Sequence, residues 1–468
     1  ALFQCFTTGL HSVNRTPVIQ QGFLYPLDEY VSTLSPQEYR RRVPSPVEPV
    51  AYRAGADGKK HYWMIPGQIE VTVLYYRKDL FVAAGLDPAR PPGDWAELKA
   101  CAEKIADPAS GRYGLVFATG PQASYGIFPY LCSAGAQAVK QESDGRWVAA
   151  FDSPEAVTAY GFVDELMKAT VTKNGKTGPI AYRGMDPWAK ITDDRVGMYF
   201  GSMHSRQFVR ENLDVVGVAP VPRGPGGISS AEINAQMMGI FAGVRDKKVR
   251  DAAWKYISFL GSDEARKIYT ETLVGMGAAR TVNPEWLEEF GYQGLARLQS
   301  PPLTEIFNQA LSQGVPEPYG KNCQFVYSYM TRPMERLYYT NFSGLSPTAR
   351  DEIIRTVLTK AVQETNEHML DRLLPEVRAK RNAVAWIVAL IAFGTFAGFL
   401  WIVFSTWRRS LLRSASPSGR RSVTAALFAF PAIALIVWWQ YYPLARGSLM
   451  AFQDYNVMGG SPWVGINN

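Results

Sequence analysis

The sequence predicts an α/β fold of two lobes that is followed by two membrane-spanning helices. Short apolar strands alternate with amphipathic helices over residues 1–375, an alternation that is typical of α/β folds. A module of this length exceeds what one hydrophobic core usually holds, so two lobes are expected. Two long apolar runs follow, at 382–407 and 422–445, and neither contains a charged residue.

Five apolar segments carry the strand prediction, because each is short and rich in β-branched or aromatic residues. They are VTVLYY at 71–76, GLVF at 114–117, VGMYF at 196–200, VVGVA at 215–219 and GIFAG at 239–243.

Four helices begin at sequence signals for N-terminal caps. Asp94 is followed three residues later by Glu97, which is the spacing of a capping box. The apolar positions after it follow a helical period and consist of Trp95, Leu98, Cys101, Ala102 and Ile105. A serine followed by proline or by acidic residues opens three further helices, at Ser153, Ser262 and Ser346.

Both apolar runs are long enough to cross a bilayer core, which takes about 20 apolar residues. The connection between them, 408–421, contains five arginines and no acidic residue. Short arginine-rich connections stay in the cytoplasm, so a hairpin is expected, with the 1–375 module outside the cell or in the periplasm. Basic residues just before 382 reduce the charge difference across the first helix. The alternative is that 422–445 is a buried helix of a soluble fold.

Composition and motifs argue against several classes of function. The net charge is only +7, and much of the arginine surrounds the apolar runs, so no nucleic-acid partner is expected. The four cysteines lack CxxC spacing and the four histidines lack HExxH, so we expect no metal and no cofactor. No GxSxG motif occurs, and NGKT at 174–177 lacks the first glycine of a phosphate loop. We therefore do not expect an enzyme.

Aromatic residues are the stronger signal in the 1–375 module. Many lie near predicted strand ends and loops, namely Tyr62, Trp63, Tyr75, Tyr76, Tyr125, Phe128, Tyr130, Trp188, Tyr199 and Phe200. Most are expected in the core. A cleft between two lobes would nevertheless turn some of their faces toward a ligand, and flat apolar faces beside polar groups suit a sugar ring.

Several segments resemble one known family in family order. PGQIEVTVLYYRKDLFVAAGLDPARPPGDWAELKACAEKI at 66–105 resembles the family 1 extracellular solute-binding proteins of bacterial sugar ABC importers. YPLDEYV, VGMYFGS, VAPVPRGPGG and AAWKYISFLGSDEARKIY are similar to it as well, so the resemblance covers about residues 17–370. It implies a two-lobed periplasmic-binding-protein fold of the type II-like class. The first strand and helix of that family would precede Ala1, so truncation is expected.

The end of the chain resembles a second family. FAFPAIALIVWWQYYPLARGSLMAFQDYNVMGGSPWVGINN at 428–468 is similar to the opening of a sugar-importer permease of the maltose type. This resemblance implies a binding protein fused to its permease, with 446–468 as the start of an outer loop and the chain cut short. It also implies a bacterial inner-membrane location, a second permease subunit and a cytoplasmic ABC ATPase as partners.

The resemblance to the maltose-binding relatives implies a set of ligand-binding residues. Glu70 matches a cleft carboxylate that accepts sugar hydroxyls, and Tyr125 matches a ring-contacting aromatic residue. Ala123 replaces an acid of the family pattern, and Met203 stands where the family has a stacking tryptophan, so maltodextrin specificity is not carried over. The expected set is Trp63, Gln68, Glu70, Tyr125, Gly201, Ser202, Met203, Asn234 and Gln236.

Three functions remain open from the sequence. The first is carbohydrate capture for an ABC-type importer, in which two lobes close on an oligosaccharide or polyol. The second is a membrane-tethered sugar sensor, although the short connection 408–421 leaves no room for an output domain. The third is a membrane-anchored glycoside hydrolase, which needs two carboxylates that flank a cleft.

Overall fold

A computed structural model of the 468-residue chain forms two compact units, residues 1–371 and 372–468. Each unit is described by itself. The structure describes residues 2–6, 18–19, 22–55, 57–120, 123–206, 208, 212–297, 303–370, 375–413, 428–432, 434–450 and 452–453.

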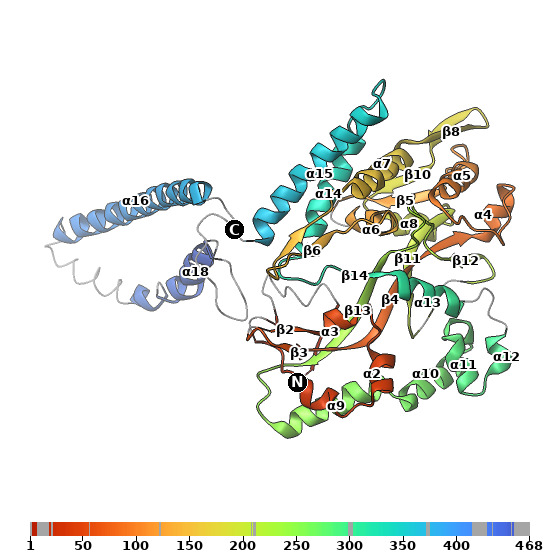
Figure 1. Cartoon of the computed structure of the whole chain (residues 1–468). Coiled ribbons are helices and arrows are strands. Elements are labelled where there is room, and N and C mark those ends of the chain that lie inside the picture. Colours follow the sequence, from red (N-terminus) through yellow and green to blue (C-terminus); the bar gives the residue numbers. More distant parts are fainter. Residues whose placement is uncertain are drawn as a thin grey trace. The chain divides into compact units, whose positions relative to one another are not determined.

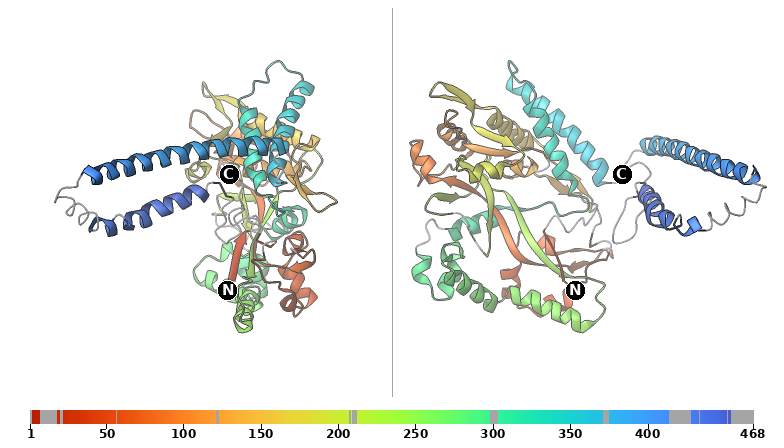
Figure 2. Two further views of the ribbon diagram at one scale, coloured as in Figure 1. Left: turned by 90° about the vertical axis from the view of Figure 1, so that its left-hand side faces the viewer. Right: turned by 180° about the vertical axis from the view of Figure 1, so that it is seen from behind.

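The first unit is built on a sheet whose longest strand is β4 (Ile65–Arg77). The order β1-β13-β4-β11 is antiparallel throughout, with β1 (Leu2–Phe6), β13 (Glu232–Ile240) and β11 (Met198–His204). Strand β12 (Val216–Ala219) pairs with the far end of β4, and β14 (Val315–Pro316) pairs with β13 in parallel. The long strands run from one group of helices toward the other (Figures 1 and 2).

Two large hydrophobic cores lie in the described part of this unit, beside a small cluster of Val282, Leu287 and Ala296, and we call the two large ones lobe 1 and lobe 2. The lobe 1 core includes Leu27, Val71, Ile233, Trp254 and Phe307. The lobe 2 core includes Leu98, Leu131, Tyr160, Met330 and Leu358. Because successive side chains of a strand point to opposite faces, β4 serves both cores. Val71 and Val73 pack into lobe 1, whereas Leu74 and Tyr76 pack into lobe 2.

Helices cover the cores on both sides of the sheet (Figure 1). Lobe 1 contains α1 (Asp28–Val31), α2 (Pro36–Arg42), α3 (Glu48–Ala51), α9 (Lys247–Leu260) and α13 (Leu303–Gln313). Lobe 2 contains α4 (Lys78–Ala83), α5 (Trp95–Ile105), α6 (Ala123–Ser133), α7 (Pro154–Lys168), α14 (Phe325–Tyr338) and α15 (Pro347–Met369). The remaining helices are α8 (Pro187–Thr192), α10 (Asp263–Gly275), η3 (Ala279–Thr281), α11 (Pro284–Glu289) and α12 (Gln293–Ala296).

Short strands complete the first unit. Strand β5 (Leu115–Ala118) pairs in parallel with β10 (Ala181–Gly184). Three antiparallel hairpins are β2 (Tyr52–Ala54) with β3 (Lys60–Tyr62), β6 (Val139–Gln141) with β7 (Trp147–Ala149), and β8 (Thr170–Lys173) with β9 (Lys176–Pro179).

The predicted helix starts are confirmed, with one difference. The Asp94 carboxylate accepts from the Glu97 amide at 2.9 Å, but the Glu97 carboxylate accepts from the Gly93 amide at 2.7 Å rather than from Asp94. In a capping box the Glu97 carboxylate would accept from the Asp94 amide, whereas here it accepts from the amide of the preceding residue. The other three caps accept from amides three residues ahead, and they are Ser153, Ser262 and Ser346.

Four of the predicted strands coincide with or overlap β4, β5, β11 and β12. The prediction at 239–243 is largely wrong, because β13 ends at Ile240 and begins already at Glu232. Polar residues at 232, 234 and 236 alternate with buried apolar ones, so the first half of this strand has no continuous apolar run. The polar half of the strand faces away from the lobe 1 core.

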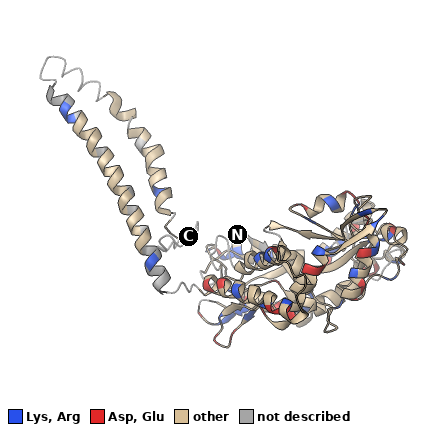
Figure 3. Ribbon diagram, turned by 90° about the horizontal axis from the view of Figure 1, so that it is seen from above, with Lys and Arg blue, Asp and Glu red and all other residues tan. Residues whose placement is uncertain are grey.

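The second unit contains α16 (Pro375–Arg413), the π-helical turn η4 (Val437–Tyr441) and α18 (Tyr442–Met450). Trp386–Thr406 and Phe428–Met450 are long and apolar enough to cross a membrane, by length and composition alone. Lys and Arg lie near both ends of α16, with an uncharged stretch between them (Figure 3). The helix continues to Arg413, and residues 414–427 of the predicted connection and second run lie outside the described residues. The predicted segment boundaries in this unit stay predictions.

Candidate functional site

A cavity of about 710 Å³ lies between the two lobes. Tyr75, Tyr199 and Phe208 come from the lobe 1 core, whereas Phe117 and Phe128 come from the lobe 2 core. The rest of the lining is Thr72, Val116, Ala118, Tyr125, Gly126, Pro129, Pro187, Trp188, Ile191, Phe200, Gly201, Ser202, His204 and Glu232. Its size falls in the range of small-molecule sites, which prefer such interfaces.

One face of the sheet supplies the polar side of the site. Residues at even positions of β4 (68, 70, 72) and β13 (232, 234, 236) are partly exposed, whereas their odd neighbours are buried in lobe 1. The Gln68 amide nitrogen lies 2.6 Å from Nδ1 of His204, and the Glu70 carboxylate lies 3.2 Å from the same atom. This contact orients the His204 ring, which lines the cavity.

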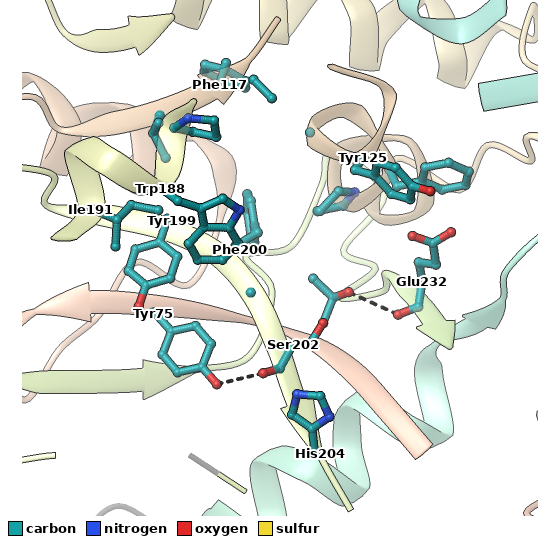
Figure 4. Close-up of a pocket in the computed structure, with 18 of the residues that line it drawn as sticks. Tyr75, Phe117, Tyr125, Trp188, Ile191, Tyr199, Phe200, Ser202, His204 and Glu232 are labelled. Carbon is teal, nitrogen blue, oxygen red and sulfur yellow. Dashed lines mark hydrogen bonds between the residues drawn. The ribbon is translucent and has the colours of Figure 1, made fainter. Parts of the chain in front are cut away.

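Aromatic rings form the opposite side and part of the floor (Figure 4). Trp188 and Tyr125 are 56% and 49% exposed, which is high for rings of this size beside a cavity. The Tyr75 and Tyr199 rings stack at 5.3 Å, and the Tyr75 hydroxyl donates to the Ser202 carbonyl at 3.0 Å. The stacked pair is therefore fixed, while the two exposed rings leave faces for a ligand.

Glu232 is the acidic residue among the described lining side chains. The Tyr327 hydroxyl donates to its carboxylate at 2.7 Å, and Thr72 donates to its carbonyl at 3.1 Å. Burial raises the pKa of the Glu232 carboxyl to about 7. Burial, together with the nearby charges of Glu317 and Glu232, raises the pKa of the Tyr125 phenol to about 12. This end of the cavity is thus aromatic and acidic.

The structure brings most of the predicted site residues to one region. Tyr125, Gly201 and Ser202 line the cavity. Gln68 and Glu70 contact His204, and they pair in register with Gln236 and Asn234 on β13. These four side chains share the polar face beside the cavity.

Two predicted site residues lie elsewhere. Met203 is fully buried in the lobe 1 core, because it follows Ser202 on β11 and so lies on the opposite face of the strand. Trp63 is 6% exposed, and its indole nitrogen donates to the Arg53 carbonyl at 2.9 Å. Neither residue is part of the cavity lining.

Glu232 and His204 line the cavity but are not among the site residues predicted from the sequence. The signal for Glu232 was the alternation Glu-Ile-Asn-Ala-Gln, which marks a half-buried strand. Six members of the predicted aromatic set line the cavity, namely Tyr75, Tyr125, Phe128, Trp188, Tyr199 and Phe200.

Among the described residues, no three His, Cys, Asp or Glu side chains come together as a metal site.

The chain is similar to known binding proteins. The family model of the bacterial extracellular solute-binding protein matches residues 12–267, more than half of the 468 residues. A Brucella abortus (strain 2308) protein, named only as a binding protein, is 26% identical over 257 residues, 54% of this chain and 57% of that protein. The maltotriose-binding protein of Pyrococcus abyssi (strain GE5 / Orsay) is 24% identical over 329 residues, 66% of this chain and 57% of that protein. The matched region thus spans little more than half the length of these relatives.

A solved structure gives the same result for the fold. The ABC transporter solute-binding protein of Thermotoga lettingae TMO, bound with α-D-tagatose, superposes with a TM-score of 0.56 at 19% identity. The match covers 79% of this chain and 85% of that one. It confirms the two-lobed binding-protein fold expected from the sequence. Since the family model covers more than half of the chain, the protein belongs to the bacterial extracellular solute-binding proteins.

Proposed function

We propose that the first unit captures a carbohydrate in the cavity between its lobes and delivers it to an ABC-type importer. The observation that carries the proposal is the pairing of two exposed rings, Trp188 and Tyr125, with a polar sheet face across the same cavity. The faces of a sugar ring carry C–H groups that pack on aromatic rings, while its hydroxyls need hydrogen-bond partners at the rim.

Polar groups at the cavity suit a ligand rich in hydroxyls. Ser202 and Thr72 carry hydroxyls, His204 carries ring nitrogens, and Glu232 carries a carboxylate that can accept from more than one donor. Hydrogen bonds to an ionised acceptor are stronger than those between neutral groups, so Glu232 and Glu70 would fix the orientation of the sugar. The names of the Pyrococcus and Thermotoga proteins, which refer to maltotriose and tagatose, support carbohydrate as the ligand class.

The test is a calorimetric titration of the full chain in a mild detergent with a panel of oligosaccharides, monosaccharides and polyols. We expect saturable binding of at least one of them. A panel without any heat of binding, obtained on protein whose circular dichroism shows a folded α/β unit, would contradict the proposal.

The second unit supports a membrane-attached form of this function. Residues along both candidate spans are exposed, for example Phe399 at 61% and Trp401 at 67%, so the helices need an apolar environment. We propose that α16 and the helix that ends at Met450 form a hairpin in the bacterial inner membrane, with the first unit outside. The second helix would begin a permease, and a second permease subunit and a cytoplasmic ATPase would complete the importer. The tether would raise the local concentration of the binding unit at the permease.

Cysteine labelling in whole cells tests this topology. Ser343, which is exposed in the first unit, and Ser405, which is partly exposed near the end of the first span, are replaced by cysteine in separate variants. A membrane-impermeant thiol reagent is expected to label the Ser343→Cys variant in intact cells and the Ser405→Cys variant only after lysis. Both variants also carry Cys5→Ser, and the remaining native thiols of Cys101, Cys132 and Cys323 are buried and give a low background. The reverse labelling pattern would contradict the outward orientation.

A further inference from the structure

The described lining of the cavity contains no lysine and no arginine, although the whole chain has an excess of positive charge. Glu232 lines the cavity, and the buried Glu317 lies close enough to raise the pKa of both Tyr125 and Tyr327. Ionisation of these carboxyl groups makes the electrostatic potential at this end negative, which favours a positively charged group on the ligand.

We propose that the cavity selects a carbohydrate that carries a positively charged nitrogen, held between the Glu232 carboxylate and the face of Tyr125. This inference rests on the proposed function and specifies the ligand class. It also implies that phosphorylated or carboxylated sugars are rejected, because the described lining offers no lysine or arginine to pair with their charge.

The arrangement around Glu232 supports a cationic partner. Tyr327 donates one hydrogen bond to Oε1, whereas a carboxylate accepts up to about four. In Figure 4 the carboxylate extends toward Tyr125, which is 49% exposed although its ring lies 5.0 Å from the ring of Tyr327. A cation between a carboxylate and an aromatic face gains a charge-assisted hydrogen bond and a cation–π contact at once.

The groups that face Glu232 come from several elements. Tyr327 lies on α14, Tyr125 on α6, and Glu317 directly after β14. His204 on β11 and Glu70 on β4 contact each other farther along the polar face. Burial is the main cause of the raised pKa of Glu232, and the bond from Tyr327 opposes it. A bound cation would stabilise the ionised form and offset this burial.

The decisive experiment is calorimetry of the full chain in detergent with three matched trisaccharides. They are the β-1,4-linked trimers of glucosamine, of N-acetylglucosamine and of glucose. We expect the glucosamine trimer to bind about 10-fold tighter than the neutral trimers near pH 7, where its amines are partly protonated and the Glu232 carboxyl is partly ionised. Glu232→Gln is expected to bring this ratio close to one. The control Glu142→Gln removes the same charge from the exposed β6–β7 hairpin and should leave the ratio unchanged.

A second measurement on the unmodified protein keeps the inference testable if Glu232→Gln does not fold. The trimer of N,N,N-trimethylglucosamine has a charge that does not titrate. Because Glu232 ionises with a pKa of about 7, the affinity for this ligand should rise as pH increases through that value, relative to the glucose trimer.

The outcomes separate the two proposals. If the neutral trimers bind as tightly as the charged ones, the selectivity proposed here is wrong and carbohydrate capture stands. If none of the panel sugars binds, charged or neutral, carbohydrate capture fails, and this inference fails with it. A preference for the charged trimers that survives Glu232→Gln would also contradict the role assigned to that carboxylate.

Discussion

Alanine at both Trp188 and Tyr125 is expected to weaken carbohydrate binding by about 100-fold. Each ring leaves about half of its surface exposed beside the cavity, and loss of one such contact costs about 1–2 kcal/mol of binding free energy. Since 1.4 kcal/mol corresponds to a factor of ten, two independent losses give about two orders of magnitude. Isothermal titration with the best ligand of the panel measures this change, and the single variants show whether the two losses add.

The matched control is Tyr256→Ala on α9, which removes a ring that is 48% exposed and does not line the cavity. Its affinity should equal that of the unmodified protein. Because Trp188 lies largely outside the core, Trp188→Ala should change the free energy of unfolding by no more than about 0.5 kcal/mol. Unchanged affinity in the double variant would exclude the two rings as the sugar platform.

Phe81→Ala is expected to lower the free energy of unfolding of the first unit by about 3–5 kcal/mol. Phe81 is fully buried on α4, and its ring lies 4.9 Å from the ring of Tyr76 on β4. Truncation removes the transfer free energy of the ring and leaves a cavity in the lobe 2 core, which the surrounding side chains fill only in part. This loss is a large fraction of the about 5–15 kcal/mol that stabilises a typical domain.

Urea unfolding of the full chain in detergent, followed by tryptophan fluorescence, measures the effect. Trp95 is one of the reporters, because it is 6% exposed and stacks on Phe162 at 4.6 Å in the same core. The neighbouring substitution Val82→Ala is the control, since Val82 is 64% exposed. It should leave the unfolding midpoint within about 0.5 kcal/mol of the original. A similar shift in both variants would show that α4 does not anchor the core as described.

The sequence allowed part of the first unit to be predicted at the level of elements. Helix starts at Ser153, Ser262 and Ser346 follow from local chemistry, since a serine oxygen satisfies an amide three residues ahead. Strands with continuous apolar runs were also found. The strand that was misplaced, β13, begins with the polar residues Glu232, Asn234 and Gln236 at alternate positions, so the apolar signal of its first half is diluted.

The candidate site could be predicted only in part. The resemblance to a family indicated Tyr125, Glu70 and Gly201, and the aromatic set contained Trp188. Met203 was expected beside Ser202 in the site, but one step along a strand moves a side chain to the other face, and Met203 is buried in lobe 1. Which face of β11 meets the second lobe depends on the packing of the lobes.

The sequence by itself determined the alternation of strands and helices, the capped helix starts and the two uncharged apolar runs, because these depend on residues close along the chain. The tertiary structure decided which residues share the cavity. Glu232 meets Tyr327 across 95 positions of sequence, and Gln68 meets His204 across 136. Such contacts follow from strand register and from the way two cores share one strand, and no local pattern encodes them.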